Sequence, residues 1–223
     1  KEPEKYIFQI DRAKYFENVD LSKEDFTRSS YYKTNAKRES EKIKFKNYDD
    51  YLTSLNMTTD LKKFKGGDIG RITQLVNKTN QFNLTVKRLD LKEIVSISKS
   101  SNFLTISGNL KDKFGDNGLI TVFIGKIKKQ TLDIVVWLMS CRVFNRNLEL
   151  ALFDHFISLC KKKGISTIYG YYIKSKKNFI VKDFYKTLGF KKVKSQKNED
   201  KWEFKIAEKY ARKNKIIRIA NEK

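Results

Sequence analysis

Apolar residues along this chain change their spacing near residue 100. Before that point they recur at helical intervals, and one face of "DIGRITQLVNKTNQFNL" collects Ile69, Ile72, Leu75 and Val76. Asp68 is placed to cap this predicted helix, and Asp90 is placed to cap a second, shorter helix over residues 90–100. The intervening "LTVKRL", residues 84–89, predicts a short strand or an extended piece.

After residue 100 the apolar positions alternate or run continuously, which is typical of strands. Three strands are predicted in succession, over residues 102–110, 118–127 and 131–140. A long helix begins at Asn147 and ends near Gly164, where glycine suits the C-terminal turn. The remaining elements are a strand over 166–173, a helix over 177–190, and two closing strands over 190–193 and 202–210.

This order of elements predicts an α+β fold with a mixed sheet. Three antiparallel strands lead into a strand–helix–strand crossover, whose two strands become parallel neighbours with a right-handed connection. The third strand, over 131–140, and the fourth, over 166–173, therefore run parallel inside an otherwise antiparallel sheet.

The first 63 residues differ from the rest, because they are polar, mostly helical in composition and poor in aliphatic residues. Ser22 and Asp25 resemble a capping box, and "NYDDYLTSLN" predicts a short helix capped by Asn47. The glycines of "FKGGDIG" mark the best boundary. We therefore expect a connector over residues 1–63, with a mainly helical extension, and one domain over residues 64–223.

The composition limits the kinds of protein and of chemical site that are possible. The chain has 223 residues, 39% of them hydrophobic, and no apolar run approaches the roughly 20 residues of a membrane helix. One His and two Cys leave no metal-ligand set, and they exclude a His-based triad. There is no signal-peptide core and no initiator Met, so we expect a cytoplasmic protein that is a piece of a longer one.

The formal net charge of +22 raises the question of nucleic acid binding. Nearly all of the basic residues are Lys, spread from end to end, whereas a nucleic-acid binder more often gathers Arg, Lys and stacking aromatics on one element. A lysine-rich composition with solvated faces is therefore the preferred interpretation, and we expect neither a nucleic acid nor a membrane partner.

The junction "MSCRVFNRNLELALFDHF" carries the most specific chemistry. A sheet that changes from antiparallel to parallel can splay there, which would leave unpaired backbone groups at the end of the strand. The free N–H groups and positive dipole end of the next helix favour an anion. This arrangement suits a pyrophosphate with an extended amide-bearing arm, as in coenzyme A or phosphopantetheine. The candidate binding residues are Leu138, Ser140, Arg142, Val143, Asn145, Arg146 and Asn147.

The order of elements resembles the GNAT (Gcn5-related N-acetyltransferase) superfold. Its pyrophosphate loop reads Gln/Arg-x-x-Gly-x-Gly/Ala, and the segment from Arg142 to Asn147 falls in register with it. "NFIVKDFYKTLGFKKV" is similar to the GNAT segment that contacts the pantetheine arm and protonates the departing thiolate. The resemblance implies the first role for Asn178 and the second for Tyr185.

A narrower resemblance is to the C-terminal half of FkbH-like proteins, carried by "RITQLVNKTNQFNLTVKRL", "LKDKFGDNGLI" and "WLMSCRVFNRNLELALFDHF". These proteins join a HAD-type (haloacid-dehalogenase-like) domain to a GNAT-like domain, and they load glyceryl units onto an acyl carrier protein. Residues 1–63 resemble the end of the HAD domain, although its Asp-x-Asp nucleophile motif is not in this chain. The resemblance implies an acyl carrier protein and a HAD-type domain as partners.

Two departures from the family bear on function. Asn145 and Asn147 stand where the family usually has glycine, and Val135-Val136 stands where it tends to have Asp-Thr. Asparagine tolerates the left-handed conformation better than other side chains, so we expect the turn to form with less room for phosphates. Ligand preference would then shift from free coenzyme A towards a carrier-bound arm.

Several candidate residues have two interpretations. Tyr185 is a general acid or a core aromatic, and Cys141 is an acyl-accepting nucleophile or a small buried strand residue. Asn80 and Gln81 line an acceptor channel or bond the backbone where a helix ends. Asp116 belongs to the site or only to a turn.

The remaining Cys and His are expected to be structural: Cys160 packs in the core, and His155 is a surface or satisfied residue. Two functions follow from the whole set of candidates. The domain is an acyltransferase that uses coenzyme A or phosphopantetheine, or a docking module for a carrier protein that has no chemistry of its own.

Overall fold

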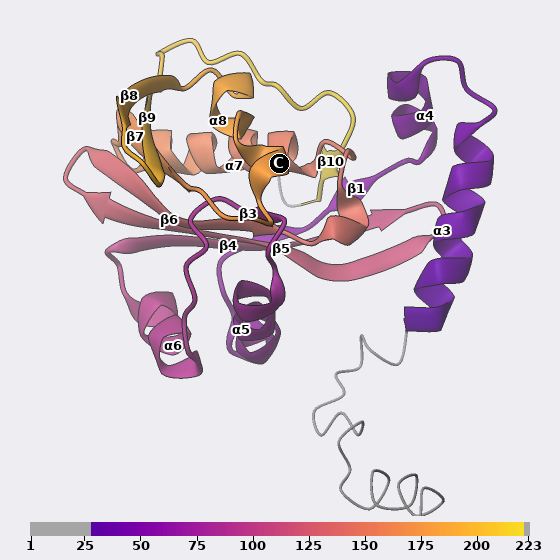
Figure 1. The fold of residues 1–223 in the computed structure, drawn as a ribbon, viewed down its shortest axis with the longest axis horizontal. Coiled ribbons are helices and arrows are strands. Elements are labelled where there is room, and N and C mark those ends of the chain that lie inside the picture. The colour runs from indigo at the N-terminus through magenta and orange to yellow at the C-terminus, as the bar shows by residue number, and fades with distance from the viewer. Residues whose placement is uncertain (1–27, 221–223) are drawn as a thin grey trace, which may run out of the picture.

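The computed structural model describes residues 28–220, and their side chains from residue 33 onward. A ten-stranded mixed sheet forms its centre (Figure 1). The helices and short 3₁₀ turns are α3 (Arg28–Lys42), α4 (Tyr48–Ser54), η1 (Gly66–Asp68), α5 (Ile69–Lys78), α6 (Leu91–Lys99), η2 (Cys141–Val143), α7 (Leu148–Lys162), η3 (Phe179–Val181) and α8 (Phe184–Thr187). The strands are β1 (Thr58–Thr59), β2 (Leu61–Lys62), β3 (Phe82–Asn83), β4 (Phe103–Asp112), β5 (Gly115–Lys128), β6 (Thr131–Met139), β7 (Thr167–Ile173), β8 (Lys191–Ser195), β9 (Glu199–Lys205) and β10 (Arg218–Ile219).

The strand order is β10-β1-β4-β5-β6-β7-β9-β8, with β2 on β4 and β3 on β6. β4, β5 and β6 form an antiparallel meander, and the crossover through α7 makes β6 and β7 parallel. β7, β9 and β8 then continue antiparallel. The predicted α+β fold with one parallel pair is confirmed.

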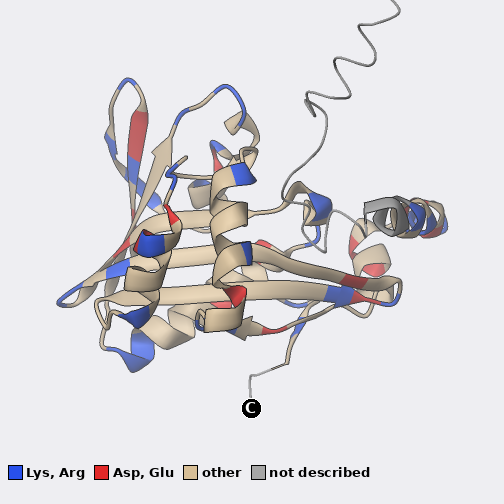
Figure 2. Ribbon diagram, turned by 90° about the horizontal axis from the view of Figure 1, so that it is seen from below, with Lys and Arg blue, Asp and Glu red and all other residues tan. Residues whose placement is uncertain are grey.

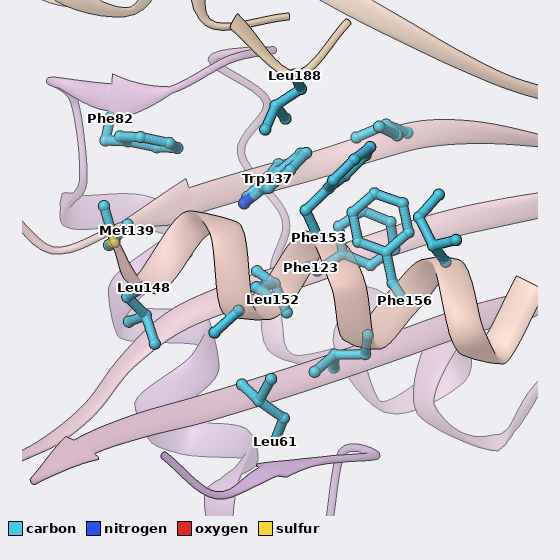
Figure 3. Packing of buried hydrophobic residues seen from close by; sticks show 14 of the residues in the cluster. Leu61, Phe82, Phe123, Trp137, Met139, Leu148, Leu152, Phe153, Phe156 and Leu188 are labelled. Carbon is cyan, nitrogen blue, oxygen red and sulfur yellow. The ribbon is translucent and has the colours of Figure 1, made fainter. Parts of the chain in front are cut away.

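Helices cover both faces of the sheet: α5 and α6 lie on one, and α7 and α8 on the other (Figure 1). The alternation along β5 and β6 explains this, because Phe123 and Trp137 face the α7 side while Val122 and Val136 face the α5 side. Under α7 the core is aromatic, and the rings of Phe123 and Phe156 stack at 4.4 Å between centroids (Figure 3). This core fixes the end of β6 and the start of α7, where the candidate site lies.

Local signals set most helix boundaries as predicted. Asp90 and Glu93 form a reciprocal capping box at the start of α6, and the side chain of Asn47 accepts from the backbone N–H of Asp49 at α4. Gly164 follows α7 with φ of 68°. Asp68 precedes α5 but makes no side-chain capping bond.

Three predicted elements differ in extent from those observed. The single helix predicted over 177–190 is broken into η3 and α8, because the backbone leaves helical geometry at Asp183 with φ of −100° and ψ of 6°. Of the two alternatives predicted over 84–89, a short strand or an extended piece, the strand is absent, and pairing is confined to β3 just before it. The last predicted strand ends at Lys205 instead of Tyr210.

Part of the predicted connector belongs to the sheet and its core. β1 and β2 pair with β4, and Leu52, Leu55 and Leu61 are buried in the main hydrophobic cluster. The assignment of residues 1–63 to the end of a preceding domain stays a prediction, and the capping box expected at Ser22 lies outside the described residues. Between residues 28 and 220, no helix is long and apolar enough to cross a membrane.

Candidate functional site

The loop between β6 and α7 has positive φ at the two positions where the resembled family has glycine. Asn145 has φ of 60° and Asn147 has φ of 61°, both in the left-handed region that glycine occupies most easily. Asparagine is the side chain that best tolerates this region. The prediction that the two asparagines preserve the turn is therefore confirmed.

The N-terminus of α7 opens from this loop. Intrahelical bonding begins with the N–H groups of Leu150 and Ala151, which donate to Asn147 O. The N–H groups at the start of a helix have no intrahelical acceptors, and the dipole makes this end positive. An anion placed against Asn147 and Leu148 would meet both features.

Arg146, one of the two arginines predicted to bind the phosphates, has a different partner. Its guanidinium is buried, and Nη1 lies 3.2 Å from Asp112 Oδ2. Arg38 of α3 binds the same carboxylate through Nε at 2.8 Å and Nη2 at 2.9 Å. Arg146 therefore links the loop to α3 and to the β4–β5 hairpin. Arg142 lines the larger cavity described below, and both arginines line a separate small pocket against α3 and α4.

The splay between β6 and β7 exists, but the chain's own backbone fills it. The two strands pair only at their beginnings, from Thr131–Asp133 to Thr167–Tyr169. Beyond that point β3 pairs with the end of β6, and Leu84 bridges the gap. Leu84 N donates to Trp137 O of β6 at 3.2 Å, and Leu84 O accepts from Ile173 N of β7 at 2.8 Å. The prediction that the end of β6 carries unpaired backbone groups was wrong.

Asn178 locks this inserted segment in place. Its Nδ2 donates to Asn83 O and to Ile173 O, each at 2.9 Å. Its Oδ1 accepts from Ser175 N at 2.9 Å and from Tyr172 OH at 3.3 Å. The residue is fully buried, so its amide makes four bonds to the protein itself. The predicted role of Asn178 in binding a pantetheine arm stays a prediction, and it would require one of these bonds to break.

A slot of about 250 Å³ lies between the start of α7 and the segment that carries η3 and α8. Met139, Phe144 and Asn145 line one side, and Val181, Asp183 and Phe184 are among the residues of the other. This slot is the space that remains for an extended arm leading from the phosphate loop.

Glu149, in the first turn of α7, also lines the slot. Burial raises the pKa of its carboxyl group, and no described residue bonds its buried Oε2 atom. The slot therefore has two acidic side chains in its lining, Glu149 and Asp183, of which Glu149 is the one with a raised pKa.

A second, larger cavity of about 850 Å³ lies against the other side of the inserted segment. It brings together five residues that the sequence analysis singled out: Asn80, Gln81, Ser140, Cys141 and Arg142. Its other polar residues were not predicted to belong to a site; they are Arg71, Gln74, Lys78, Thr79, Lys176 and Lys177. In a chain with 48 Lys and Arg residues, these cations carried no distinguishing signal.

Phe82 lines both the slot and the cavity. Its buried ring packs edge-on against Phe184 at 4.9 Å and lies near Met139 at the end of β6 (Figure 3). Phe82 is therefore the wall between the two spaces.

Cys141 is exposed at the mouth of the larger cavity. The alternative interpretation, a small buried strand residue, is wrong because β6 ends at Met139 and Cys141 begins the η2 turn. Cys160, by contrast, is buried as expected, and burial raises the pKa of its thiol to about 12. The role of Cys141 as an acyl acceptor stays a prediction.

Tyr185 lies in the core. It is fully buried, its hydroxyl donates to Tyr171 O at 3.5 Å, and it lines neither the slot nor the cavity. Burial raises the pKa of its hydroxyl group far above the ordinary value. In this conformation the Tyr185 hydroxyl group does not reach the slot or the cavity, so it could not protonate a ligand there. The geometry agrees with the alternative of a core aromatic.

The other predicted site residues that lie outside the two spaces are Leu138, Val143, Asp116, Arg146, Asn147 and Asn178. Leu138 and Val143 are fully buried in the hydrophobic clusters, so only their backbone groups could reach a ligand. Asp116 accepts from Gly118 N at 2.8 Å within its turn and pairs with Lys111 at the surface. Among the residues that the structure describes, no group of His, Cys, Asp or Glu is placed to hold a metal ion.

Comparison with known proteins agrees with this geometry at the level of the fold. No protein-family model matches the sequence, and no curated protein sequence matches it. Solved structures do match. The ribosomal-protein-S18-alanine N-acetyltransferase from Escherichia coli aligns with a TM-score of 0.53 and 12% identity, over 69% of this chain and 97% of that one.

Two further structures show the same likeness. The PaiA N-acetyltransferase from Thermoplasma acidophilum, in complex with coenzyme A, aligns with a TM-score of 0.52 and 17% identity, over 66% of this chain and 99% of that one. The GNAT domain of S. lividans PAT aligns with a TM-score of 0.50 and 13% identity, over 65% of this chain and 89% of that one. The described chain therefore has the fold of the GNAT acetyltransferases.

Proposed function

We propose that this domain transfers an acyl group from a thioester of coenzyme A or phosphopantetheine to a small acceptor. The observation that carries the proposal is the left-handed backbone at Asn145 and Asn147, directly before α7 and beside the slot. This conformation presents backbone N–H groups to an anion, as a pyrophosphate requires. A fold shared with an acetyltransferase solved in complex with coenzyme A supports the same ligand.

The chain's own residues would bind the pyrophosphate of the donor and position its arm. Backbone groups from Asn145 to Leu148 would hold the pyrophosphate, and Met139, Phe144 and Phe184 would enclose the arm in the slot. In the transfer itself, the acceptor's nucleophilic atom bonds to the acyl carbon, the carbon–sulfur bond breaks, and the acceptor's proton ends on the released thiol.

The pairing of β3 with β6 constrains how the arm is bound. An arm in the slot would contact side chains, because the backbone groups of β6 near Leu138 are already bonded to Asn83 and Leu84. We therefore expect lower affinity than in a site where the arm adds to the strand edge.

The resemblance to FkbH-like proteins extends the proposal. The acyl group would be a glyceryl unit, the acceptor or donor would be an acyl carrier protein, and a HAD-type domain would be the partner in the cytoplasm. These finer assignments rest on the sequence resemblance alone.

A second candidate function, a docking module for an acidic carrier protein, is favoured by a surface feature. Phe179 and Ile180 are 63% and 61% exposed beside the slot, and Lys176, Lys177 and Lys182 surround them in the chain. Exposed apolar side chains ringed by cations suit an acidic partner. The burial of Tyr185 also favours this function over catalysis.

Calorimetric titration at moderate salt tests both functions, with coenzyme A, acetyl-coenzyme A and a phosphopantetheinylated carrier protein as ligands. The transferase proposal predicts micromolar binding of a coenzyme A species. Binding of the carrier protein alone, and equally well without its phosphopantetheine arm, would refute it and support the docking module.

Asn145→Gly/Asn147→Gly adds a sharper test of the loop. Glycine keeps φ > 0 and removes both side chains from the phosphate space, so coenzyme A affinity should rise about threefold to tenfold. Asn56→Gly is the matched control, because Asn56 also has positive φ, at 49°, and lines neither the slot nor the cavity. Unchanged affinity in the double variant would contradict the loop assignment.

A further inference from the structure

We propose that the larger cavity binds the acyl acceptor through an anionic group, a phosphate or a carboxylate, on that acceptor. That the ligand is the acyl acceptor rests on the proposed function. That the ligand is an anion rests on the residues of the cavity itself. Three segments far apart in the sequence form the cavity: α5 with the turn after it, the end of β6 with η2, and the loop after β7.

The charges of the cavity all have one sign. Its lining holds five cationic side chains and no Asp or Glu, the cations being Arg71, Lys78, Arg142, Lys176 and Lys177. Basic residues are scattered over most elements of the molecule, so abundance alone does not mark a site (Figure 2). Cations that line a concave wall do mark a candidate site, because low-dielectric surroundings concentrate their electric field.

Neutral polar groups complete the lining without cancelling this charge. Gln74, Asn80 and Gln81 supply amides, and Thr79 and Ser140 supply hydroxyls. The Gln74 side chain accepts a hydrogen bond from Arg71 Nη1, which holds that guanidinium at the wall. Leu75 and Phe82 provide the apolar part of the lining. Such a lining suits a ligand with one strongly anionic end and a short polar or apolar body.

Phe82 lines both the slot and the cavity, so the two spaces adjoin at this residue. Within the loop, Asn145 lines the slot, whereas Ser140 and Arg142 line the cavity. The acceptor's anion would therefore lie on the Arg142 side of the loop, and the donor's phosphates would lie against Asn145 to Leu148. The acceptor's reactive group would therefore meet the end of the slot at Phe82, with its anionic end among the lysines.

Binding of three matched amines tests the charge requirement. Phosphoethanolamine and β-alanine carry an amino group and an anion, whereas ethanolamine has the same length without the anion. Titration followed by NMR or calorimetry, at low and at physiological salt, should show that phosphoethanolamine binds at least about tenfold more tightly than ethanolamine. Equal binding of the two, or no binding of either anionic compound, would overturn the proposal.

Lys176→Ala/Lys177→Ala tests the location. Both side chains are exposed, so their loss should not unfold the domain, and phosphoethanolamine affinity should fall about tenfold. Lys191→Ala/Lys194→Ala removes the same charge from β8, outside the cavity, and should change that affinity less than about twofold. Equal losses in the two variants would show a response to net charge and refute the site.

Coenzyme A is titrated into the same two variants, to distinguish this proposal from the proposed function. If Lys176→Ala/Lys177→Ala loses coenzyme A affinity and Lys191→Ala/Lys194→Ala does not, the cavity binds the donor and the acceptor proposal is overturned. Anion binding in the cavity, with no coenzyme A binding to any variant, would refute the acyltransferase function while supporting the anion site.

Discussion

The carboxylate of Asp112 gives the sharpest stability prediction. Its side chain has no exposed surface and accepts five hydrogen bonds from Arg38, Arg146 and the backbone N–H groups of Phe114 and Gly115. It is the anion that the two buried guanidinium groups share. Replacement by Asn keeps the shape and removes the charge.

The loss in free energy of unfolding caused by Asp112→Asn comes from the groups that stay buried beside residue 112. Two buried cations lose their counter-charge, and the new amide NH₂ turns a donor towards other donors. Breaking a buried ion pair by removing one partner typically costs about 3–5 kcal/mol. For a domain of this size, each kcal/mol lowers Tm by roughly 2–4 °C, so we expect a decrease of roughly 6–20 °C.

Thermal and urea unfolding measure this cost, with Asp116→Asn as the matched control. Asp116 lies at the start of β5, next to the same hairpin, and pairs with Lys111 at 3.2 Å, but it is 45% exposed. Exposed pairs contribute about 0–1 kcal/mol, so the control should unfold close to the parent protein. Equal losses in the two variants would refute the buried network. Because Arg146 belongs to the loop that we propose binds the phosphates, Asp112→Asn should also weaken coenzyme A binding while the domain is still folded.

Three further changes test the packing around the site. Gly170→Ala places a Cβ closer to the Tyr185 ring than van der Waals contact allows and should cost about 1–3 kcal/mol in unfolding experiments, whereas Gly66→Ala, with open space around it, should cost much less. Tyr185→Phe should leave any transfer rate unchanged, because the hydroxyl reaches only Tyr171 O; a rate decrease without loss of stability would restore the general-acid role. Glu149→Gln should stabilise the domain at neutral pH, because burial raises the pKa of Glu149 above its ordinary 4.5 and the ionised form is therefore disfavoured. The gain should shrink as pH falls towards 4.5 and should disappear below it, where Glu149 is protonated in both states; a gain independent of pH would contradict this explanation.

The structure also changes which arginine should be tested for ligand binding. Arg142→Ala removes a side chain that lines the cavity, so it should weaken anionic ligands without unfolding the domain. Arg146→Ala should instead destabilise the domain, because it leaves Arg38 as the sole cationic partner of Asp112 within the described network. Titration with the three amines and urea unfolding of both variants separate these effects.

The sequence by itself determined the order of elements and the local shape of the loop. Period-two runs in β4, β5 and β6, helical spacing in α5 and α7, and the crossover rule were enough to place one parallel pair in the sheet. Asn145 and Asn147 were predicted to keep the left-handed turn because they stand where the resembled family has glycine, and because asparagine tolerates that conformation. These features depend on a residue and its near neighbours in the chain.

Only the tertiary structure decided what occupies the splay and which charges face the cavities. The bond from Asn178 to Asn83 joins residues 95 positions apart, and the bond from Arg38 to Asp112 joins residues 74 apart. No periodicity reports such pairings, because each partner is an ordinary polar residue in its own segment. The lysines of the larger cavity resemble every other lysine of this basic chain until folding brings three distant segments around one space.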